Sequence, residues 1–160
     1  MLSSKQLPSL FEAITKVNFT NQHWFSGVNH KSNRPVNPYF QLAAHLPRLE
    51  TLTFTLHNAG LTTSCYGERQ MIELERTDLL RARDRKVHGL SKVVEIYDIA
   101  EIFRCRSLCR VRLEYIECAR MRAYTKVGNA AELMRQLQVF LVNGFAEQGM
   151  YVHVELARVN

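Results

Sequence analysis

The feature that most constrains this chain is a short apolar pattern that occurs three times. Apolar side chains stand at the first, fourth and sixth positions of the segments ITKVNF (14–19), LETLTF (49–54) and LCRVRL (108–113). From the fourth position on, apolar and polar residues alternate, as expected for a strand that buries one face. Residues 150–156 alternate in the same way, with Met150, Val152, Val154 and Leu156 on one side. Four half-buried strands are therefore predicted.

A helical stretch precedes each of these strands. The clearest spans residues 129–148, where apolar residues recur at helical spacing: Leu133, Leu137, Phe140, Leu141 and Phe145. Asn129 can cap its start, with Glu132 three residues later as in a capping box, and Gly149 can end it in a left-handed conformation. Shorter apolar stretches at 7–14, 40–46 and 93–103 predict three more helices, the last with Ser91 as a cap.

Two irregular segments separate these units. Residues 20–38 are rich in Asn, Gly, Pro and Ser and predict a loop, with Trp24 and Phe25 held in the core. Residues 57–90 are highly charged, and part of this segment is expected to be a solvated helix that starts near Thr77 or Asp78 and ends at Gly89.

The alternation in all four strands indicates a sheet with only one covered face. Because the gaps between strands are long enough for crossover connections, we predict an α/β fold with an open-faced, largely parallel four-stranded sheet and helices packed on one face. The uncovered face would carry Lys16, Asn18, Thr20, Thr51, Thr53, Thr55, His57, Arg110, Arg112, Glu114, Tyr151, His153 and Glu155. The core would contain Ile14, Val17, Phe19, Leu49, Leu52, Phe54, Leu108, Val111, Leu113, Leu137, Phe140, Leu141, Val152 and Val154.

The segments LPRLETLTFTL and CRSLCRVRLEYIE resemble the helix–strand units of leucine-rich-repeat proteins, particularly the irregular units that follow the F-box-type segment in many fungal proteins. The resemblance implies a leucine-rich-repeat-like layer whose open sheet face binds proteins. The family's Asn or Cys position falls on His57 and on Ile116, so the Asn ladder of a regular horseshoe is not expected. No F-box-like segment is present, so a recruitment role is not implied.

Length and composition favour one globular domain over residues 1–160, either a whole protein or a piece of a longer chain. No apolar run approaches the length of a membrane span and no leader is recognised, so we expect an intracellular protein without a membrane partner. The four cysteines are expected to be reduced. A zinc site would need Cys105, Cys109, Cys118 and His88, whose spacing is poor, so no metal or cofactor is expected.

Catalytic motifs such as HExxH, GxSxG and the P-loop are missing from the sequence. The best catalytic hypothesis pairs His57 or His153 with Glu114 or Glu155 on the open face. A solvated sheet face explains the same residues more simply, so no enzyme is predicted.

Two binding functions remain. Six arginines lie within 104–122, the chain has a net charge of +6, and Tyr151 and His153 on an open sheet could stack nucleic acid bases. RNA or DNA binding is therefore the alternative, although no RNP signature is present. The favoured function is protein interaction through the open face, since Arg and Tyr are enriched where binding energy concentrates. The predicted partner-binding residues are Thr55, His57, Arg110, Arg112, Tyr151 and His153.

Overall fold

In the computed structural model, which describes residues 7–20, 37–66 and 68–159, four strands form one parallel sheet, here called the main sheet. They lie side by side in chain order: β1 (Lys16–Phe19), β2 (Thr51–His57), β5 (Arg110–Ile116) and β7 (His153–Val159). The predicted α/β fold with a parallel four-stranded sheet is confirmed, and the sheet is parallel throughout. Trp24 and Phe25 lie outside the described residues.

Equivalent positions of neighbouring strands are paired without a stagger, which aligns the apolar side chains in rows. Two of the rows that face the helices are Val17, Leu52, Val111 and Val154, followed by Phe19, Phe54, Leu113 and Leu156, and a third row contains the buried Leu56 and Tyr115. The fourth and sixth positions of the recurring apolar pattern are therefore paired with their counterparts in the next strand. Ten of the fourteen predicted core residues are buried, and Ile14, Val17, Phe140 and Val152 are partly buried against them.

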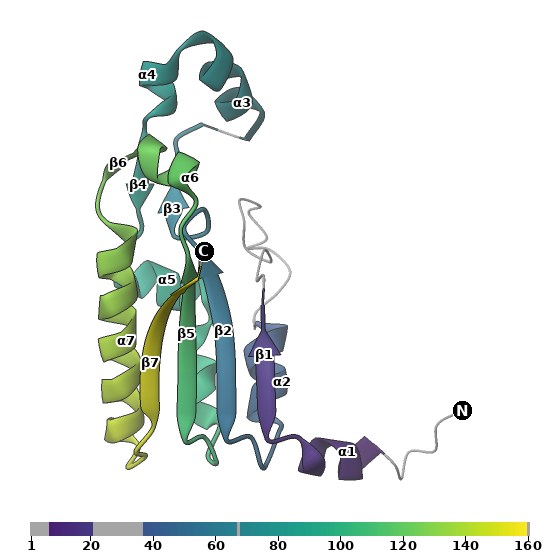
Figure 1. Ribbon diagram of the computed structural model, residues 1–160. Coiled ribbons are helices and arrows are strands. Elements are labelled where there is room, and N and C mark those ends of the chain that lie inside the picture. Colours follow the sequence, from purple (N-terminus) through teal and green to yellow (C-terminus); the bar gives the residue numbers. More distant parts are fainter. Residues whose placement is uncertain (1–6, 21–36, 67, 160) are drawn as a thin grey trace.

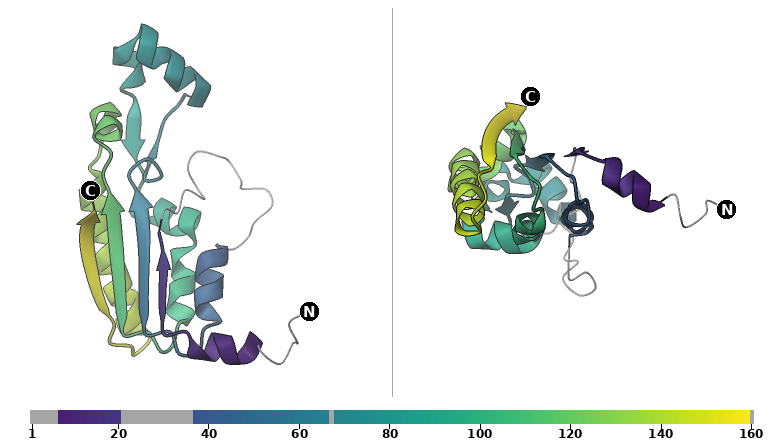
Figure 2. Two further views of the ribbon diagram at one scale, coloured as in Figure 1. Left: turned by 45° about the vertical axis from the view of Figure 1, so that its right-hand side comes forward. Right: turned by 90° about the horizontal axis from the view of Figure 1, so that it is seen from below.

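The helices of this part of the chain pack on one side of the main sheet, as the view from below shows (Figure 2). They are α2 (Pro38–Ala44), α5 (Leu90–Tyr97), the 3-10 helix η2 (Ile99–Arg104) and α7 (Ala130–Glu147). The predicted one-sided helical layer is therefore confirmed. The first helix, α1 (Leu7–Ala13), extends past the β1 edge instead, and Leu10, which was expected to belong to its apolar face, is 57% exposed.

Several predicted element boundaries are wrong for local reasons. Asp98 adopts a left-handed conformation (φ 53°), which divides the expected helix at 93–103 into α5 and η2. Gly89, not Ser91, is the residue at the start of α5. The last strand begins at His153 rather than at 150, because the chain first turns back from α7 through Gly149 (φ 72°) and Met150.

The start of α7 follows the sequence prediction. The side-chain oxygen of Asn129 accepts hydrogen bonds from the backbone N–H groups of Ala131 (2.9 Å) and Glu132 (3.3 Å). Glu132 forms an ion pair with Arg135 at 2.7 Å. Asn129 alone therefore supplies the side-chain cap that the structure gives for this helix.

One side chain of α7 covers part of the sheet edge. The His153 N–H donates toward β5, to Cys109 O at 2.9 Å, so the carbonyl of the next residue, Val154, points away from β5. Gln138 Nε2 donates to this carbonyl at 2.8 Å. A polar group on the outer side of β7 is thereby satisfied within the chain, which lowers the tendency of the edge to pair with another strand.

Residues 58–88 and 117–128 together form a second region, here called the cap; the rest of the described chain is called the body. Within the described residues the cap holds a small sheet and three short helices: β3 (Thr62–Thr63), α3 (Glu68–Thr77), α4 (Leu79–Ala82), β4 (Arg85–Val87), α6 (Ala119–Tyr124) and β6 (Thr125–Val127). The cap stands beyond the carboxyl ends of the main strands and does not lie across the main sheet (Figure 1).

The predicted helix from Thr77 or Asp78 to Gly89 is wrong. Asp78 does cap a helix, since its side chain accepts a bond from Arg81 N at 3.2 Å, but that helix has four residues. Residues 85–87 then form β4, which pairs antiparallel with β3 and parallel with β6. The partner strand β6 lies about forty residues further along the chain, and no local pattern reveals that pairing.

Asn58 ties the cap to the end of the main sheet. It is buried, its Nδ2 donates to Cys118 O at 3.0 Å, and its Oδ1 accepts from Cys118 N at 3.3 Å. The position at which the leucine-rich-repeat resemblance places Asn or Cys is His57, one residue earlier. Asn58 thus joins the turns that follow two neighbouring strands, through both hydrogen-bonding sides of its amide.

Candidate binding surface

The open face of the main sheet presents four rows of side chains, set by the same unstaggered register as the core rows. From the amino to the carboxyl ends of the strands, the rows are Lys16, Thr51, Arg110 and His153; Asn18, Thr53, Arg112 and Glu155; Thr55, Glu114 and Ala157; and His57, Ile116 and Val159. The strands β5 and β7 are neighbours, so Arg110, Arg112 and His153, three of the six predicted partner-binding residues, occupy adjacent positions of the open face, whereas Tyr151 precedes β7.

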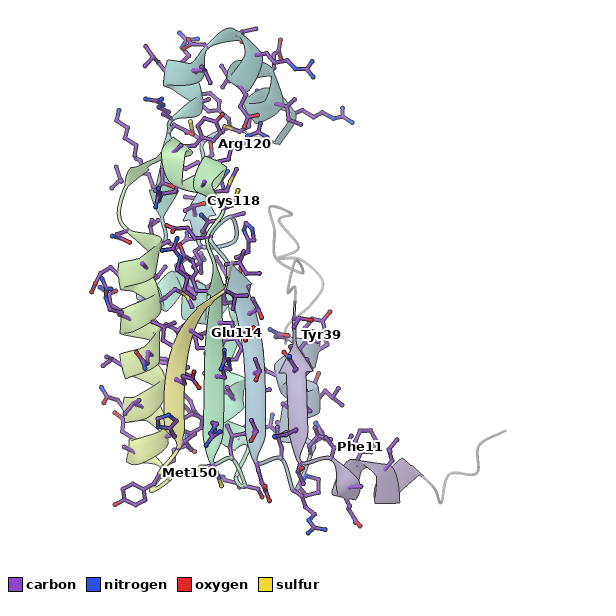
Figure 3. All side chains as sticks on the ribbon, viewed as in Figure 1. Phe11, Tyr39, Glu114, Cys118, Arg120 and Met150 are labelled. Carbon is purple, nitrogen blue, oxygen red and sulfur yellow. The ribbon has the colours of Figure 1, made fainter. Side chains whose placement is uncertain are left out.

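A charged network occupies the centre of this face. Arg112 Nε lies 3.0 Å from Glu114 Oε1, and its Nη1 lies 3.2 Å from Glu155 Oε1 on the neighbouring strand. The Thr55 hydroxyl donates to the second oxygen of Glu114 at 2.9 Å. Glu114 is labelled near the middle of the main sheet in Figure 3. Arg112 is therefore held in one position before any partner arrives, which lowers the ordering cost of binding.

Thr55 departs from the prediction that it is an exposed contact residue. Only 4% of its surface is exposed, and its hydroxyl is committed to Glu114. From the neighbouring strand β2, Thr55 therefore holds the Glu114 carboxylate in position. Alternation places Thr55 on the open face correctly, but it does not report how deeply a side chain of that face is buried.

The row at the amino ends of the strands differs from the centre. Lys16, Arg110 and His153 are exposed, and none of their side chains has a hydrogen-bond or ion-pair partner within the described residues. Tyr151, which precedes β7, is 99% exposed beside the turn that contains Met150 (Figure 3). This end of the face thus offers unpaired positive charge, and the exposed Tyr151 lies two residues before His153 in the chain.

His57 lies at the other end of the face, in the last row. Its Nδ1 accepts a hydrogen bond from Ala59 N at 3.1 Å, which supports the turn into the cap. The two histidines of the catalytic hypothesis therefore stand at opposite ends of the sheet, and both candidate carboxylates, Glu114 and Glu155, hold Arg112. The geometry groups these residues as a salt-bridge network rather than as an acid and a base around one cavity.

The six arginines of 104–122 do not form one stripe. Near the amino end of β5, Arg104 pairs with Glu101 at 2.7 Å and Arg106 bonds Gln148 at 2.9 Å. In the cap, Arg120 pairs with Glu75, and Arg122 lies 3.6 Å from Glu117. Arg110 and Arg112 lie between these groups on the open face. Five of the six thus have a partner within the protein, which weakens the case for a continuous phosphate-binding track.

The four cysteines are unpaired and dispersed. Cys105 is buried beneath the main sheet, where burial raises the pKa of its thiol to about 11. Cys109 is exposed at the start of β5, and Cys65 and Cys118 belong to the cap. Within residues 7–20, 37–66 and 68–159, His, Cys, Asp and Glu side chains form no group of three or more that could hold a metal ion.

A groove of about 590 Å³ lies on the opposite, helical side of the body. Its floor is apolar and includes Phe103, Val139 and Phe140, and Gly144 of α7 lets the Phe103 ring approach the helix backbone closely. At its rim Glu132 and Arg135 neutralise each other. Glu147 also lines the groove, and within the described residues it has no ion-pair partner.

In comparisons with protein-family models, curated proteins and solved structures, the chain has no match. In the described part of the chain, no helix has both the length and the apolar character needed to cross a lipid bilayer. The role of Thr55 as a support for Glu114 and the contact made by Asn58 were not predicted from the sequence. Both depend on pairing between segments some sixty residues apart, and the only local signal was the polar residue type.

Proposed function

We propose that this protein is a non-enzymatic protein-interaction module, which binds an acidic segment of a protein partner on the open face of its main sheet. The observation that carries the proposal is the contrast along that face. Arg112 is fixed between two carboxylates, whereas Lys16, Arg110 and His153 at the amino ends are exposed and unpaired within the described residues. A partner with carboxylates opposite this row gains charge complementarity against a rigid surface.

Two further features support a protein as the partner. Tyr151 is the kind of large amphipathic side chain that contributes strongly to protein interfaces, and its whole surface is free for contact. The resemblance to leucine-rich-repeat units implies binding on the same face. An intracellular location belongs to the proposal, because four unpaired cysteines suit a reducing compartment.

The test starts from partner capture with the immobilised protein, with and without nuclease treatment of the lysate. The captured partner is identified and purified, and its affinity is measured for the wild-type protein and for Arg110→Glu and Arg112→Glu. Losing a central arginine contact costs about 2 kcal/mol or more, so we expect each affinity to fall at least about thirtyfold. Circular dichroism must show that the variants are folded, and Arg110→Glu keeps the test valid if Arg112→Glu disturbs the network.

The matched control is Arg135→Glu, which makes the same charge change on an exposed arginine of α7. Partner affinity should be unchanged in this variant. Equal losses in all three variants would mean that net charge, not the open face, determines binding.

Nucleic acid binding is tested in the same series with a nonspecific RNA at two salt concentrations. The proposal expects weak RNA binding throughout. Tight RNA binding with a steep salt dependence, together with loss of the captured partner after nuclease treatment, would replace the protein partner by a nucleic acid.

A further inference from the structure

The exposed cations of the open face lie in one row that runs across the strands. The register places Lys16 beside Thr51, Thr51 beside Arg110, and Arg110 beside His153, at the amino ends of the four main strands (Figure 1). Neighbouring strands of a sheet are about 4.8 Å apart. The backbone positions of Lys16 and Arg110 are therefore about 10 Å apart, and those of Arg110 and His153 are about 5 Å apart.

The other three rows of the open face carry no further unpaired lysine or arginine among the described residues. Arg112 is held by Glu114 and Glu155, and the two rows nearest the cap contain no lysine or arginine. Glu50, which precedes Thr51 and is exposed, forms no ion pair with the row within the described residues. A partner that lies along one strand would meet one of the three cations, whereas a partner that lies across the strands meets all three.

The face of a sheet also restricts the backbone of such a partner. Backbone hydrogen bonds of a sheet lie in its plane and join neighbouring strands, so the face offers side chains only. An extended segment that lies across the strands would bury some of its own N–H and C=O groups without partners, whereas an α-helix satisfies these groups internally. The open face therefore favours a helix over an extended segment.

The geometry of a helix also matches the spacing of the row. Residues seven apart on one face of an α-helix are about 10.5 Å apart along its axis, and residues four apart are about 6 Å apart. Carboxylates at positions i, i+7 and i+11 would stand opposite Lys16, Arg110 and His153 in turn, and positions i, i+4 and i+11 serve for the opposite helix direction. An extended segment presents residues to one face at intervals of about 6.6 Å, which match neither spacing.

We propose that the acidic segment bound by the open face is an α-helix that lies across the amino ends of the main strands, with a row of carboxylates opposite Lys16, Arg110 and His153. This inference rests on the proposed function and names the form of the partner segment. Because exposed ion pairs contribute little individually, the three cations act through their number and arrangement.

The probe is a synthetic alanine-rich peptide of about sixteen residues with glutamates at its third, seventh, tenth and fourteenth positions. These positions share one helix face and serve both helix directions, and a hydrocarbon staple on the opposite face keeps the peptide helical. One control peptide is stapled but distributes the four glutamates around the helix. The other keeps the glutamate positions, lacks the staple and has proline at two central positions, which prevents a helix.

Binding is measured at low salt by nuclear magnetic resonance titration of the isotope-labelled protein, whose spectrum also shows whether each variant is folded. We expect the peptide with one acidic face to bind about tenfold more tightly than either control. Its binding should shift the amide signals of Lys16, Arg110 and His153 and should weaken at high salt.

Arg110→Glu should lower the affinity of this peptide about tenfold, whereas Arg135→Glu, the same charge change on α7, should leave it unchanged. A peptide with lysine in place of the seventh or the tenth residue should restore binding to Arg110→Glu. Restoration by one of these two peptides separates a contact in register from an effect of net charge, and it identifies the direction of the helix.

Equal binding of the three glutamate peptides to the wild-type protein would overturn the helix. If the affinity of the captured partner still depends on Arg110 in that case, the proposed function stands without it. An unchanged affinity of the captured partner for Arg110→Glu would overturn the proposed function, and this inference with it, whatever the peptides do.

Discussion

The body and the cap are built by different means. In the body, one apolar pattern recurs along the chain and stacks on itself in unstaggered rows, with a continuous core between sheet and helices. In the cap, the strands have two or three residues, and the described buried apolar side chains are Leu61, Met71 and Ala82. Repetition along the chain can therefore specify a layer locally, whereas a small appended region depends on particular polar contacts.

Those polar contacts are visible in the cap. Arg85 donates from Nε to Thr62 Oγ1 at 2.9 Å and from Nη2 to the carbonyls of Ala59 and Thr62 at 3.2 and 3.3 Å. Asn58 bonds both backbone groups of Cys118. Hydrogen bonds from single side chains thus connect segments of the cap, whereas apolar contacts connect the elements of the body. The stability of the two regions should therefore respond differently to substitution.

The largest difference is expected from core truncation. Leu137→Ala, at a fully buried position of α7, should lower the free energy of unfolding by about 3 kcal/mol, because it leaves a cavity in a closely packed core. Met71→Ala in the cap should lower the free energy of unfolding by about 1 kcal/mol, because few buried side chains surround Met71 and they can close the cavity. Urea unfolding of both variants measures the difference. Equal costs would show that the cap core is as well packed as the body core.

The body could be predicted from the sequence because its information is local and repeated. The alternation that includes Val17, Leu52, Val111 and Val154 predicted which faces are buried, and the structure pairs these residues with one another across the strands. Two boundary errors arose near residues with a left-handed backbone, Asp98 between α5 and η2 and Gly149 between α7 and β7, which periodicity does not detect.

The cap could not be predicted, because β4 and β6 come from segments separated by the whole β5 unit. The candidate surface was predicted in part. Arg110, Arg112 and His153 were placed together correctly, whereas the burial of Thr55 and the position of Tyr151 ahead of the strand depend on details of packing and turn geometry. The ion pair between Arg112 and Glu155 could not be predicted from the sequence either, because these residues meet only across neighbouring strands.

A smaller effect is expected at the junction of the two regions. Asn58→Ala leaves the N–H and C=O of Cys118 without their side-chain partner, which should cost about 2 kcal/mol. Hydrogen exchange should then rise for amides of β3, β4 and β6, with little change in the centre of β5. Asn143→Ala, an exposed position on α7, serves as the control and should cost almost nothing. A uniform rise in exchange across both regions would contradict a separately held cap.

The smallest effect concerns pH. Partial burial, with further contributions from Lys92 and Arg85, lowers the pKa of His88 below its ordinary value of 6.5. The folded protein therefore binds this proton less readily than the unfolded chain, so the contribution of neutral His88 is complete above pH 6.5 and declines as the pH falls toward the lower folded pKa. Between about pH 7 and pH 5, wild-type stability should fall more than that of His88→Gln. If wild type and His88→Gln lose the same stability over this pH range, His88 is not the cause of the pH dependence.

The claim that the open face is the binding surface can be tested most directly by site-specific photo-crosslinking. Benzoylphenylalanine is placed at Tyr151, which is fully exposed beside the unpaired row, and in a separate protein at Val139, which is exposed on α7. Each protein is irradiated in lysate, and adducts are identified by mass spectrometry. We expect one dominant protein adduct from position 151, lost in the Arg110→Glu background, and none of the same mass from position 139. The same adduct from position 139 alone, or from position 151 regardless of Arg110, would contradict the claim.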